Sequence, residues 1–371
     1  MQNLKNLLFR DDESLIGSNW YYLEKKLFIF PLLLSFIGLL AIYSLIGSEY
    51  SIALLLKHTV FLLFSLSILF FFSLIPINNL RKILNIIAIS FLLFLALVPL
   101  LGYEVKGATR WINLKFFSIQ PSEILKGPIL CLFSWFCYLF IKTSKSLYMF
   151  LSILIILFVS ALLLLQPDIG TLMLYLSSFF LLIILYLRNI KLFFILGFFG
   201  ALFLAFAYFT FDHVSLRIDK FFSSESSPQV ARSLSAIIGG GFFGVGLGEG
   251  QLKYSIPESH NDFIFAILIE EFGIFFGLFI ALLYPIFFLL IKQILKSQPN
   301  LFIQNTTFSL CFILCIQAFI NIGSSIDLIP PTGMTLPFIS YGGSSMLSYA
   351  IIFGTLINFS KNEKNSLSNT S

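Results

Sequence analysis

The sequence predicts an all-α, polytopic integral membrane protein. Hydrophobic residues make up 58% of its 371 positions, charged residues only 11%, and the mean hydropathy is +0.95. Apolar runs of about 20 residues recur along the chain, and a helix of that length crosses ~30 Å of hydrocarbon. The four cysteines lie inside such runs, without the spacing of a metal site or a disulfide framework. This composition excludes a soluble globular domain.

The chain is expected to divide into a membrane domain, residues 27–359, between two polar tails, residues 1–26 and 360–371. Ten apolar segments are expected to form its helices: Leu27–Ile46, Ile52–Ile75, Ile83–Leu101, Ile124–Ile141, Leu147–Leu165, Leu172–Leu187, Leu192–Phe211, Phe263–Ile291, Phe302–Ile322 and Ser345–Phe359. Most connections are short, so successive helices are expected to be antiparallel neighbours. The polar first 26 residues lack the apolar core of a cleavable signal peptide.

Lysine and arginine residues set the expected orientation. With a cytoplasmic N-terminus, each short inner loop carries a basic pair, for example Arg81 with Lys82. Both termini are then cytoplasmic, and the long loops 102–123 and 212–262 lie outside. These outer loops hold basic residues that the topology rule disfavours: Lys106, Arg110, Lys115, Arg217, Lys220, Arg232 and Lys253. These basic residues indicate an anionic ligand at the outer face. The alternative is that long loops are translocated across the membrane regardless of their charge.

The most unusual stretch runs from Ser255 to Gly273. It places Glu258, His260 and Asp262 within five residues, directly before an apolar run that contains Glu270 and Glu271. Carboxylates at the mouth of a membrane helix are costly and suggest function. The alternative for Asp262 is a first-turn position where a negative charge suits the helix dipole. At least one of Glu270 and Glu271 is expected to point into the bundle.

Two helix starts on the outer side carry a Gln-Pro motif. Gln120-Pro-Ser-Glu123 has the acid in the first helical turn, and Lys126 follows three residues later on the same face. Glu123 and Lys126 are therefore expected to form an ion pair, which leaves open whether Lys126 also binds a ligand. Gln166-Pro-Asp168 opens a second such helix.

Two glycine-rich stretches lie on the outer side. Residues 239–250 contain seven glycines but lack the βαβ context of a nucleotide site. The last outer loop, 323–344, ends in an uncharged run with Ser340, Gly342, Gly343 and Ser344 at the start of the tenth helix. Free N–H groups there are candidates for binding phosphate, and a tight turn for close helix packing is the alternative.

Six motifs in order identify the chain as similar to a known family. GATRWINL, IQPSEILK, QPDIGT, GVGLGEG, PESHNDFIFAILIEEFG and PPTGMTLPFISYGGSS together resemble the SEDS family (shape, elongation, division and sporulation), over essentially the whole chain. The resemblance implies a peptidoglycan glycosyltransferase that polymerises lipid II at the outer face of the plasma membrane. It implies Asp262 as the catalytic residue, although Asn261 stands where the family usually has Thr. It also implies Gln120 to Glu123, followed by Lys126, as the matching outer motif.

The resemblance also implies partners: lipid II, a class B penicillin-binding protein, and other divisome or elongasome membrane proteins, with no nucleic acid. The GEG run, the GMTLPFISYGGSS run and the lead-in Leu15–Trp20 look more like division-type FtsW at the septum, whereas the short tails would suit elongation-type RodA. A lipid II flippase and a non-catalytic divisome scaffold remain alternatives.

The proposed reaction matches the residue types. Lipid II carries a pyrophosphate leaving group, so the site needs a base for the attacking hydroxyl and cations for the developing charge. Asp262 is the expected base, and Arg110, Lys126, Arg217 and Lys253, with Ser340, Gly342, Gly343 and Ser344, are the candidate substrate contacts. Gln120, Glu123, Asp168, His260 and Glu270 are the expected supporting residues. Mg²⁺ or Mn²⁺ on the pyrophosphate is conceivable, without a dedicated metal cluster.

Overall fold

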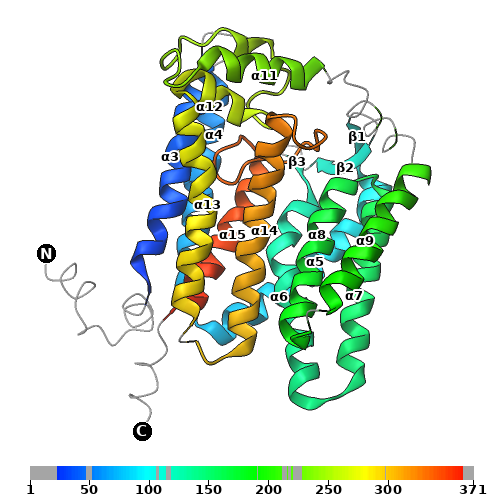
Figure 1. Ribbon diagram of the computed structural model, residues 1–371. Coiled ribbons are helices and arrows are strands. Elements are labelled where there is room, and N and C mark those ends of the chain that lie inside the picture. Colours follow the sequence, from blue (N-terminus) through cyan, green and yellow to red (C-terminus); the bar gives the residue numbers. More distant parts are fainter. Residues whose placement is uncertain are drawn as a thin grey trace, which may run out of the picture.

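The structure is a computed structural model in which most of the chain is described. The described residues are 23–46, 52–105, 108–113, 118–189, 191–210, 215, 219, 228–296 and 298–361. They form a helical bundle, as the composition predicts (Figure 1). The described chain begins and ends at the same end of this bundle, opposite the long loops (Figure 1). We call the end with the long loops the outer end, following the predicted orientation.

Helices occupy all ten predicted segments. They are η1 Lys25–Phe28 with α3 Ile29–Tyr43, α4 Ile52–Leu74, α5 Ile77–Leu101, α6 Pro121–Thr143, α7 Ser146–Leu165, α8 Ile169–Leu187, α9 Lys191–Thr210, α12 Ile264–Phe272 with α13 Ile274–Leu295, α14 Leu301–Ser325 and α15 Gly343–Phe359. Among the described residues, eight of these helices are long and apolar enough to cross a membrane. The chain is thus an all-α, multi-pass membrane protein.

The eighth predicted helix is broken, which the sequence analysis did not predict. Gly273 has a φ of +85° and separates α12 from α13. Its N–H still donates to Ile269 O, but a Cβ at this position would lie 2.2 Å from the carbonyl oxygen of Phe242. Only glycine fits, because both the left-handed backbone and the neighbouring chain exclude a side chain.

The glycine-rich stretch supplies the backbone partners that this break requires. The N–H groups of Val245 and Gly246 donate to the carbonyls of Glu270 and Glu271 at the end of α12, at 2.9 and 3.0 Å. The N–H of Ile274, the first residue of α13, donates to the carbonyl of Gly241 at 3.0 Å. Backbone groups near the hydrocarbon must be satisfied within the protein, so the loop makes the broken helix possible.

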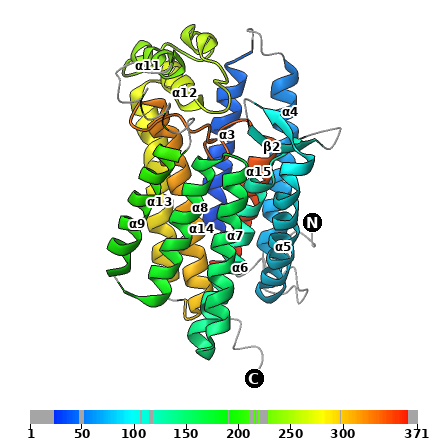
Figure 2. The ribbon, with the colours of Figure 1, turned by 90° about the vertical axis from the view of Figure 1, so that its right-hand side faces the viewer.

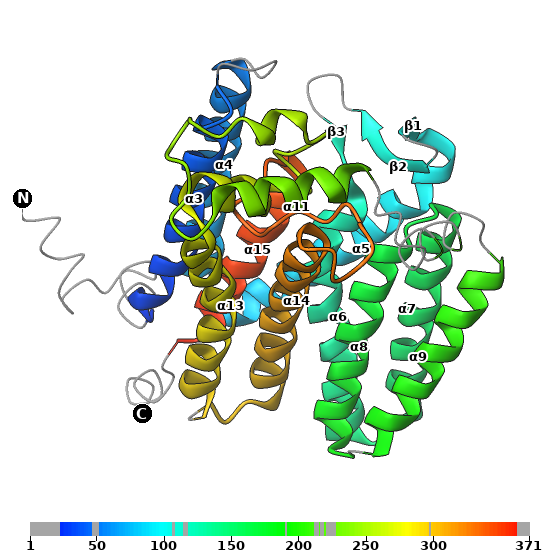
Figure 3. The ribbon, with the colours of Figure 1, turned by 45° about the horizontal axis from the view of Figure 1, so that its top comes forward.

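Both long outer loops contain structure that we did not predict. The first holds a three-stranded antiparallel sheet in the order β1 (Tyr103–Val105), β2 (Ala108–Asn113), β3 (Ser118–Ile119). The second holds α11 (Pro228–Gly240) and the short helix η2 (Leu252–Ser255). Ser233 of α11 donates to the carbonyl of Ser325 at the end of α14. Helix α11 therefore lies across the outer end of the bundle (Figure 3).

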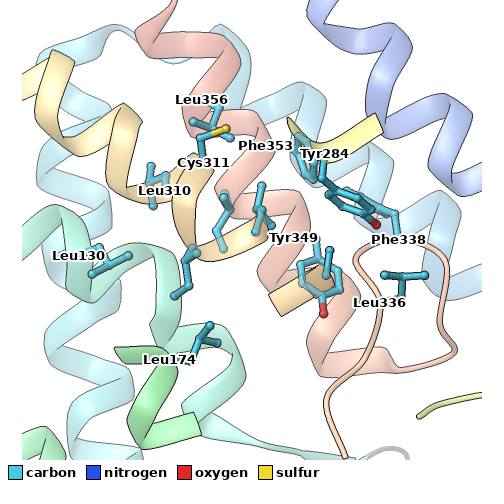
Figure 4. Close-up of a cluster of buried hydrophobic side chains, with 14 of the residues drawn as sticks. Leu130, Leu174, Tyr284, Leu310, Cys311, Leu336, Phe338, Tyr349, Phe353 and Leu356 are labelled. Atoms are coloured by element: carbon cyan, nitrogen blue, oxygen red, sulfur yellow. The ribbon is translucent and has the colours of Figure 1, made fainter. Parts of the chain in front are cut away.

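Helix α15 forms the centre of the bundle. It packs against α4, α6 and α14, and nearly all of its residues are buried (Figures 2 and 3). Around it, Tyr349 and Phe353 contact Phe338 of the last outer loop, with ring centroids 5.9 and 5.5 Å apart (Figure 4). At the inner end, Asn358 donates to three carbonyls, including that of Ile75 at 2.6 Å. The last outer loop is thus joined to the core of the protein.

Candidate active site at the outer end of the bundle

Asp262 lies at the outer end of the bundle, two residues before α12. The chain makes a turn there, in which the N–H groups of Asn261 and Asp262 both donate to the carbonyl of Glu258, at 2.9 and 3.2 Å. Glu258 itself adopts a left-handed backbone, with a φ of +54°. The Asp262 side chain is half-buried, so its carboxylate is neither inside the core nor on an open surface.

Two amide side chains on α14 hold this region together. Asn321 donates to the backbone carbonyl of Asp262 at 2.9 Å and to that of Met334 at 2.7 Å. One turn earlier, Gln317 donates to the carbonyl of Thr335 at 3.1 Å. Residues four apart share a helix face, so a single face of α14 fixes both the Asp262 turn and the last outer loop.

The length of the same helix predicts that Asp262 lies near the membrane boundary. Asn321 lies 20 residues after the start of α14, a rise of ~30 Å at 1.5 Å per residue. Helix α13, which packs beside α14, has 22 residues and is ~33 Å long. The hydrocarbon core is ~30 Å thick, so Asp262 and Gly273 are both expected at its outer boundary.

Lys126 and Glu123 form the predicted ion pair. The ammonium of Lys126 lies 2.7 Å from Glu123 Oε1 and donates to Gln317 Oε1 at 3.0 Å. Lys126 is buried, and its charge is satisfied by these two acceptors. The second oxygen of Glu123, Oε2, is buried without a hydrogen-bond partner among the described residues. The pair therefore supports the site through α14 and leaves one carboxylate oxygen available as an acceptor.

The last outer loop covers Asp262. Gly333 has a φ of +75°, and a Cβ there would lie 3.5 Å from Asp262 Oδ2. The hydroxyl of Ser340 donates to the carbonyl of Asn261 at 2.6 Å and accepts from the N–H of Leu336 at 2.8 Å. Ser340 is fully buried, so both of its described contacts hold the loop onto the Asp262 turn.

The start of α15 is tightly packed. A Cβ at Gly342 would lie 2.3 Å from Ser345 Oγ, and a Cβ at Gly343 would lie 3.1 Å from the ring of Phe61 on α4. Ser344 is buried. These contacts agree with the alternative stated for the sequence, a turn for close helix packing, and the phosphate-binding prediction stays a prediction.

Arg110 belongs to a second polar cluster at the outer end. It donates to the carbonyls of Gln166 and Pro167 at 3.2 and 2.5 Å and lies 3.6 Å from Asp168 Oδ1. Asp168 caps α8 through the N–H of Thr171. The cluster is completed by Gln120, which donates to Asp168 Oδ2 at 3.4 Å.

This cluster adjoins the last outer loop. A Cβ at Gly170 would lie 3.3 Å from Met334 Cε and 3.6 Å from Thr332 Cβ. The carbonyl of Met334 also accepts the hydrogen bond from Asn321. The Arg110 side chain is about a quarter exposed, so its guanidinium is not fully enclosed by this cluster.

Lys253 has a different environment from the one expected of a substrate contact. It is fully buried, and its ammonium forms an ion pair with Glu271 and donates to the carbonyl of Ser44 at 2.7 Å. Glu270, the expected supporting residue, accepts from the backbone N–H groups of Leu252 and Lys253, both at 2.7 Å. The end of α12 and the end of α3 enclose Lys253, and its predicted contact with the substrate stays a prediction. Arg217 lies outside the described residues.

His260 lies against two aromatic rings. Its ring centroid is 5.6 Å from that of Tyr341, which in turn stacks at 6.0 Å on His58 of α4. The carbonyl of His260 accepts from the N–H of Tyr341 at 2.9 Å. Burial lowers the pKa of His260, and the nearby charge of Glu258 only partly opposes this effect. The imidazole is therefore neutral at pH 7 and supports the Asp262 turn by packing.

The sequence analysis missed Gln317 and Asn321. Both lie in an apolar segment, four residues apart, and amide side chains in such a segment face other protein elements rather than lipid. That spacing was the available signal. Among the described residues, no group of three His, Cys, Asp or Glu side chains is placed to hold a metal ion.

The fold defines a multi-pass membrane protein, and the candidate site is a half-buried carboxylate, Asp262, at the outer end of its bundle. The family model "Cell cycle protein" (FTSW_RODA_SPOVE) matches residues 24–365. The chain belongs to this family of FtsW, RodA and stage V sporulation protein E.

Curated relatives agree with this assignment. The chain is 31% identical to "Probable peptidoglycan glycosyltransferase FtsW" of Caulobacter vibrioides, over 95% of this chain and 93% of that protein. It is 35% identical to the protein of the same name from Wigglesworthia glossinidia brevipalpis, over 88% of this chain and 91% of that protein. Stage V sporulation protein E of Bacillus subtilis is 34% identical, over 76% and 78%.

Solved structures share the fold. One is described as "Structural coordination of polymerization and crosslinking by a peptidoglycan synthase complex", with a TM-score of 0.75 and 23% identity over 91% of this chain and 97% of that chain. Another is the rod shape determining protein RodA of Thermus thermophilus, with a TM-score of 0.66 and 24% identity over 92% and 98%.

Proposed function

We propose that this chain is a peptidoglycan glycosyltransferase that polymerises lipid II into glycan strands at the outer face of the plasma membrane. Its relatives bear the name of this activity. The observation that carries the proposal is the placement of Asp262. Its backbone is held by Asn321 of the membrane-spanning candidate α14, and its half-buried carboxylate lies against Gly333 at the outer end of the bundle. A lipid-linked sugar presents its hydroxyl at this depth.

In the proposed reaction, Asp262 accepts the proton of the attacking sugar hydroxyl as a general base. The lipid pyrophosphate leaves without protonation, so the site needs positive charge rather than a strong acid. Arg110 is a candidate for this role, because its side chain is partly exposed and it belongs to the cluster beside the last outer loop. Lys126 is buried and donates to Glu123 and Gln317. Gln317 in turn donates to the last outer loop, so Lys126 supports the site indirectly. Mg²⁺ or Mn²⁺ enters the proposal only as a counter-ion of the pyrophosphate.

The biological setting is part of the same proposal: septal wall synthesis in cell division, with a class B penicillin-binding protein as partner. The FtsW names of its relatives and the synthase complex among its structural neighbours support this setting.

Polymerisation of lipid II by the purified protein, with and without its transpeptidase, tests the proposal. Asn is close to Asp in size but cannot accept a proton at neutral pH, so Asp262→Asn is expected to lower the rate by ~10²–10⁴. Expression and lipid II binding are expected to persist. Glu258→Gln and His260→Ala are the matched controls, because both residues lie on the same turn, and they are expected to be milder.

A rate near wild type for Asp262→Asn would refute the assignment of the base.

A lipid II flippase is the alternative function. The broken helix α12–α13 favours it, because transporters use broken helices. Its carboxylates Glu270 and Glu271 are held by backbone N–H groups and Lys253, which argues against a moving proton or ion site. Lipid II transport by proteoliposomes that contain only this chain would favour the flippase.

A further inference from the structure

The inner end of the bundle, opposite the long loops, carries an arginine that lies over an aromatic ring. Arg81 is one turn after the start of α5, and the Cζ of its guanidinium lies 3.7 Å from the centroid of the Trp135 ring on α6. A guanidinium this close to a ring face is held by a cation–π interaction, which does not use its N–H donors. The stack therefore leaves the N–H groups of Arg81 available to a ligand.

Other aromatic side chains hold the ring of Trp135 in place. It stacks on Tyr138, with centroids 5.5 Å apart and an interplanar angle of 28°, and it meets Phe302 edge-on at 5.3 Å and 86°. Phe302 is buried near the start of α14 and contacts Phe359 at the end of α15, with centroids 5.9 Å apart. Residues of three helices thus fix the ring on which Arg81 lies, so the guanidinium is positioned before a ligand binds.

The charge of Arg81 is not neutralised within the part of the chain that the structure describes. The ion pairs found there join other cations to carboxylates, and the Arg81 guanidinium donates no hydrogen bond to a described residue. Exposed Lys142 adds a second positive charge nearby, because its Nζ lies 5.9 Å from the centroid of Tyr138, the ring stacked on Trp135. The charge that complements this surface is negative.

Asn85 provides a second polar group one turn deeper. It lies four residues after Arg81, so the two side chains share a face of α5, with Cβ atoms about 5–6 Å apart. Its Oδ1 is buried, and its amide makes no hydrogen bond to a described residue. Helix α5 has 25 residues and is ~38 Å long, so Arg81 is expected at the inner boundary of ~30 Å of hydrocarbon and Asn85 just inside it. A polar group at that depth requires a hydrogen-bond partner.

We propose that Arg81 and Asn85 form a binding site for an anionic glycerophospholipid, such as phosphatidylglycerol, in the inner leaflet. The phosphate accepts from the N–H groups of Arg81, whose planar fork matches two phosphate oxygens. One turn deeper, the amide of Asn85 donates to an ester carbonyl of the same lipid. A single glycerol unit joins the phosphate to the esters, which agrees with the single helical turn between the two side chains. Lys142 contributes attraction for the net negative charge.

Quenching of Trp135 fluorescence by brominated lipids tests this proposal on the purified full chain in nanodiscs. The changes Trp20→Phe and Trp111→Phe leave Trp135, which contacts Arg81, as the only tryptophan. A small fraction of brominated phosphatidylglycerol in phosphatidylcholine is compared with the same fraction of brominated phosphatidylcholine. The expected preference for phosphatidylglycerol is about fivefold, the factor that corresponds to ~1 kcal/mol for one basic residue at an anionic surface.

Arg81→Gln is expected to abolish this preference. Lys82→Gln is the matched control, because it removes the same charge at the same level of α5 from an exposed side chain that does not share the face of Arg81. The control is expected to keep the preference. Asn85→Leu is expected to weaken quenching by both brominated lipids, since both carry ester carbonyls.

Four outcomes would overturn the proposal. Equal quenching by the two lipids before Arg81 is changed would exclude an anion site, and this result does not depend on the folding of an Arg81 variant. An equal loss in Arg81→Gln and Lys82→Gln would show a general attraction of the surface. Relief of quenching by soluble glycerol phosphate would identify a free phosphate as the ligand. Unchanged quenching in Asn85→Leu would remove the second contact. None of these readouts depends on glycan synthesis, so the proposal is tested independently of the proposed function.

Discussion

Replacement of Lys253 by methionine tests the buried ion pair that closes the loop containing Asp262. Lys253 and Glu271 are both fully buried, and Glu270 holds the backbone of Leu252 and Lys253. These contacts tie residues 252–253 to residues 270–271, so the intervening segment with Asp262 is a loop with fixed ends. Lys253→Met keeps most of the side-chain volume and removes the charge, which leaves the Glu271 carboxylate buried without its cation.

The expected magnitude follows from the environment. Loss of one partner of a buried ion pair costs about 3–5 kcal/mol, because the remaining charge stays desolvated. The carbonyl of Ser44 also loses its donor, which adds a further ~1–3 kcal/mol if water does not replace it. The double variant Lys253→Met with Glu271→Gln is expected to recover much of this loss, since the amide is neutral and still accepts from the N–H of Gly248.

Thermal unfolding of the purified variants in detergent measures the effect. Lys145→Met is the matched control, because Lys145 is exposed in a short loop and its replacement is expected to change stability by no more than about 0.5 kcal/mol. Equal stability of Lys253→Met and Lys145→Met would refute the reasoning. So would a double variant that is less stable than Lys253→Met alone.

Three further predictions concern stability. Lys126→Met is expected to cost about 3–5 kcal/mol and to be partly rescued by Glu123→Gln, whereas additive effects in a double-mutant cycle would show that the two side chains do not meet. Gly244→Ala is expected to prevent folding or to lower thermal stability far more than Gly241→Ala, because both glycines have a positive φ but only Gly244 faces a carbonyl at 2.1 Å; equal effects would contradict this packing. Burial lowers the pKa of His260, so the unfolded chain takes up a proton first as the pH falls below ~6.5, and stability is expected to decline there. The decline should shrink in His260→Gln, and an unchanged pH profile would rule out His260 as its source.

The sequence predicted several features of the site correctly. Pro121 begins α6, with Glu123 in its first turn and Lys126 paired to it, because residues three apart on a helix must share a face. Gln166-Pro-Asp168 opens α8, as predicted, and the structure adds that the Asp168 side chain caps this helix. The orientation and the role of Asp262 stay predictions, since they depend on a membrane and a substrate.

The class of protein, the positions of its helices and the local pairs were determined by the sequence alone, because apolar length and helical spacing are local properties. The break at Gly273, the loop that caps it and the buried partner of Lys253 were decided by the tertiary structure. From the sequence alone, a lysine in an outer loop is interpreted as solvent-exposed or ligand-binding, because its neighbours in space are not known. Lys253 contacts Ser44, 209 residues away, and Glu271, 18 residues away. No periodicity in the chain encodes such a meeting, because it arises only when the ends of α3 and α12 come together in space.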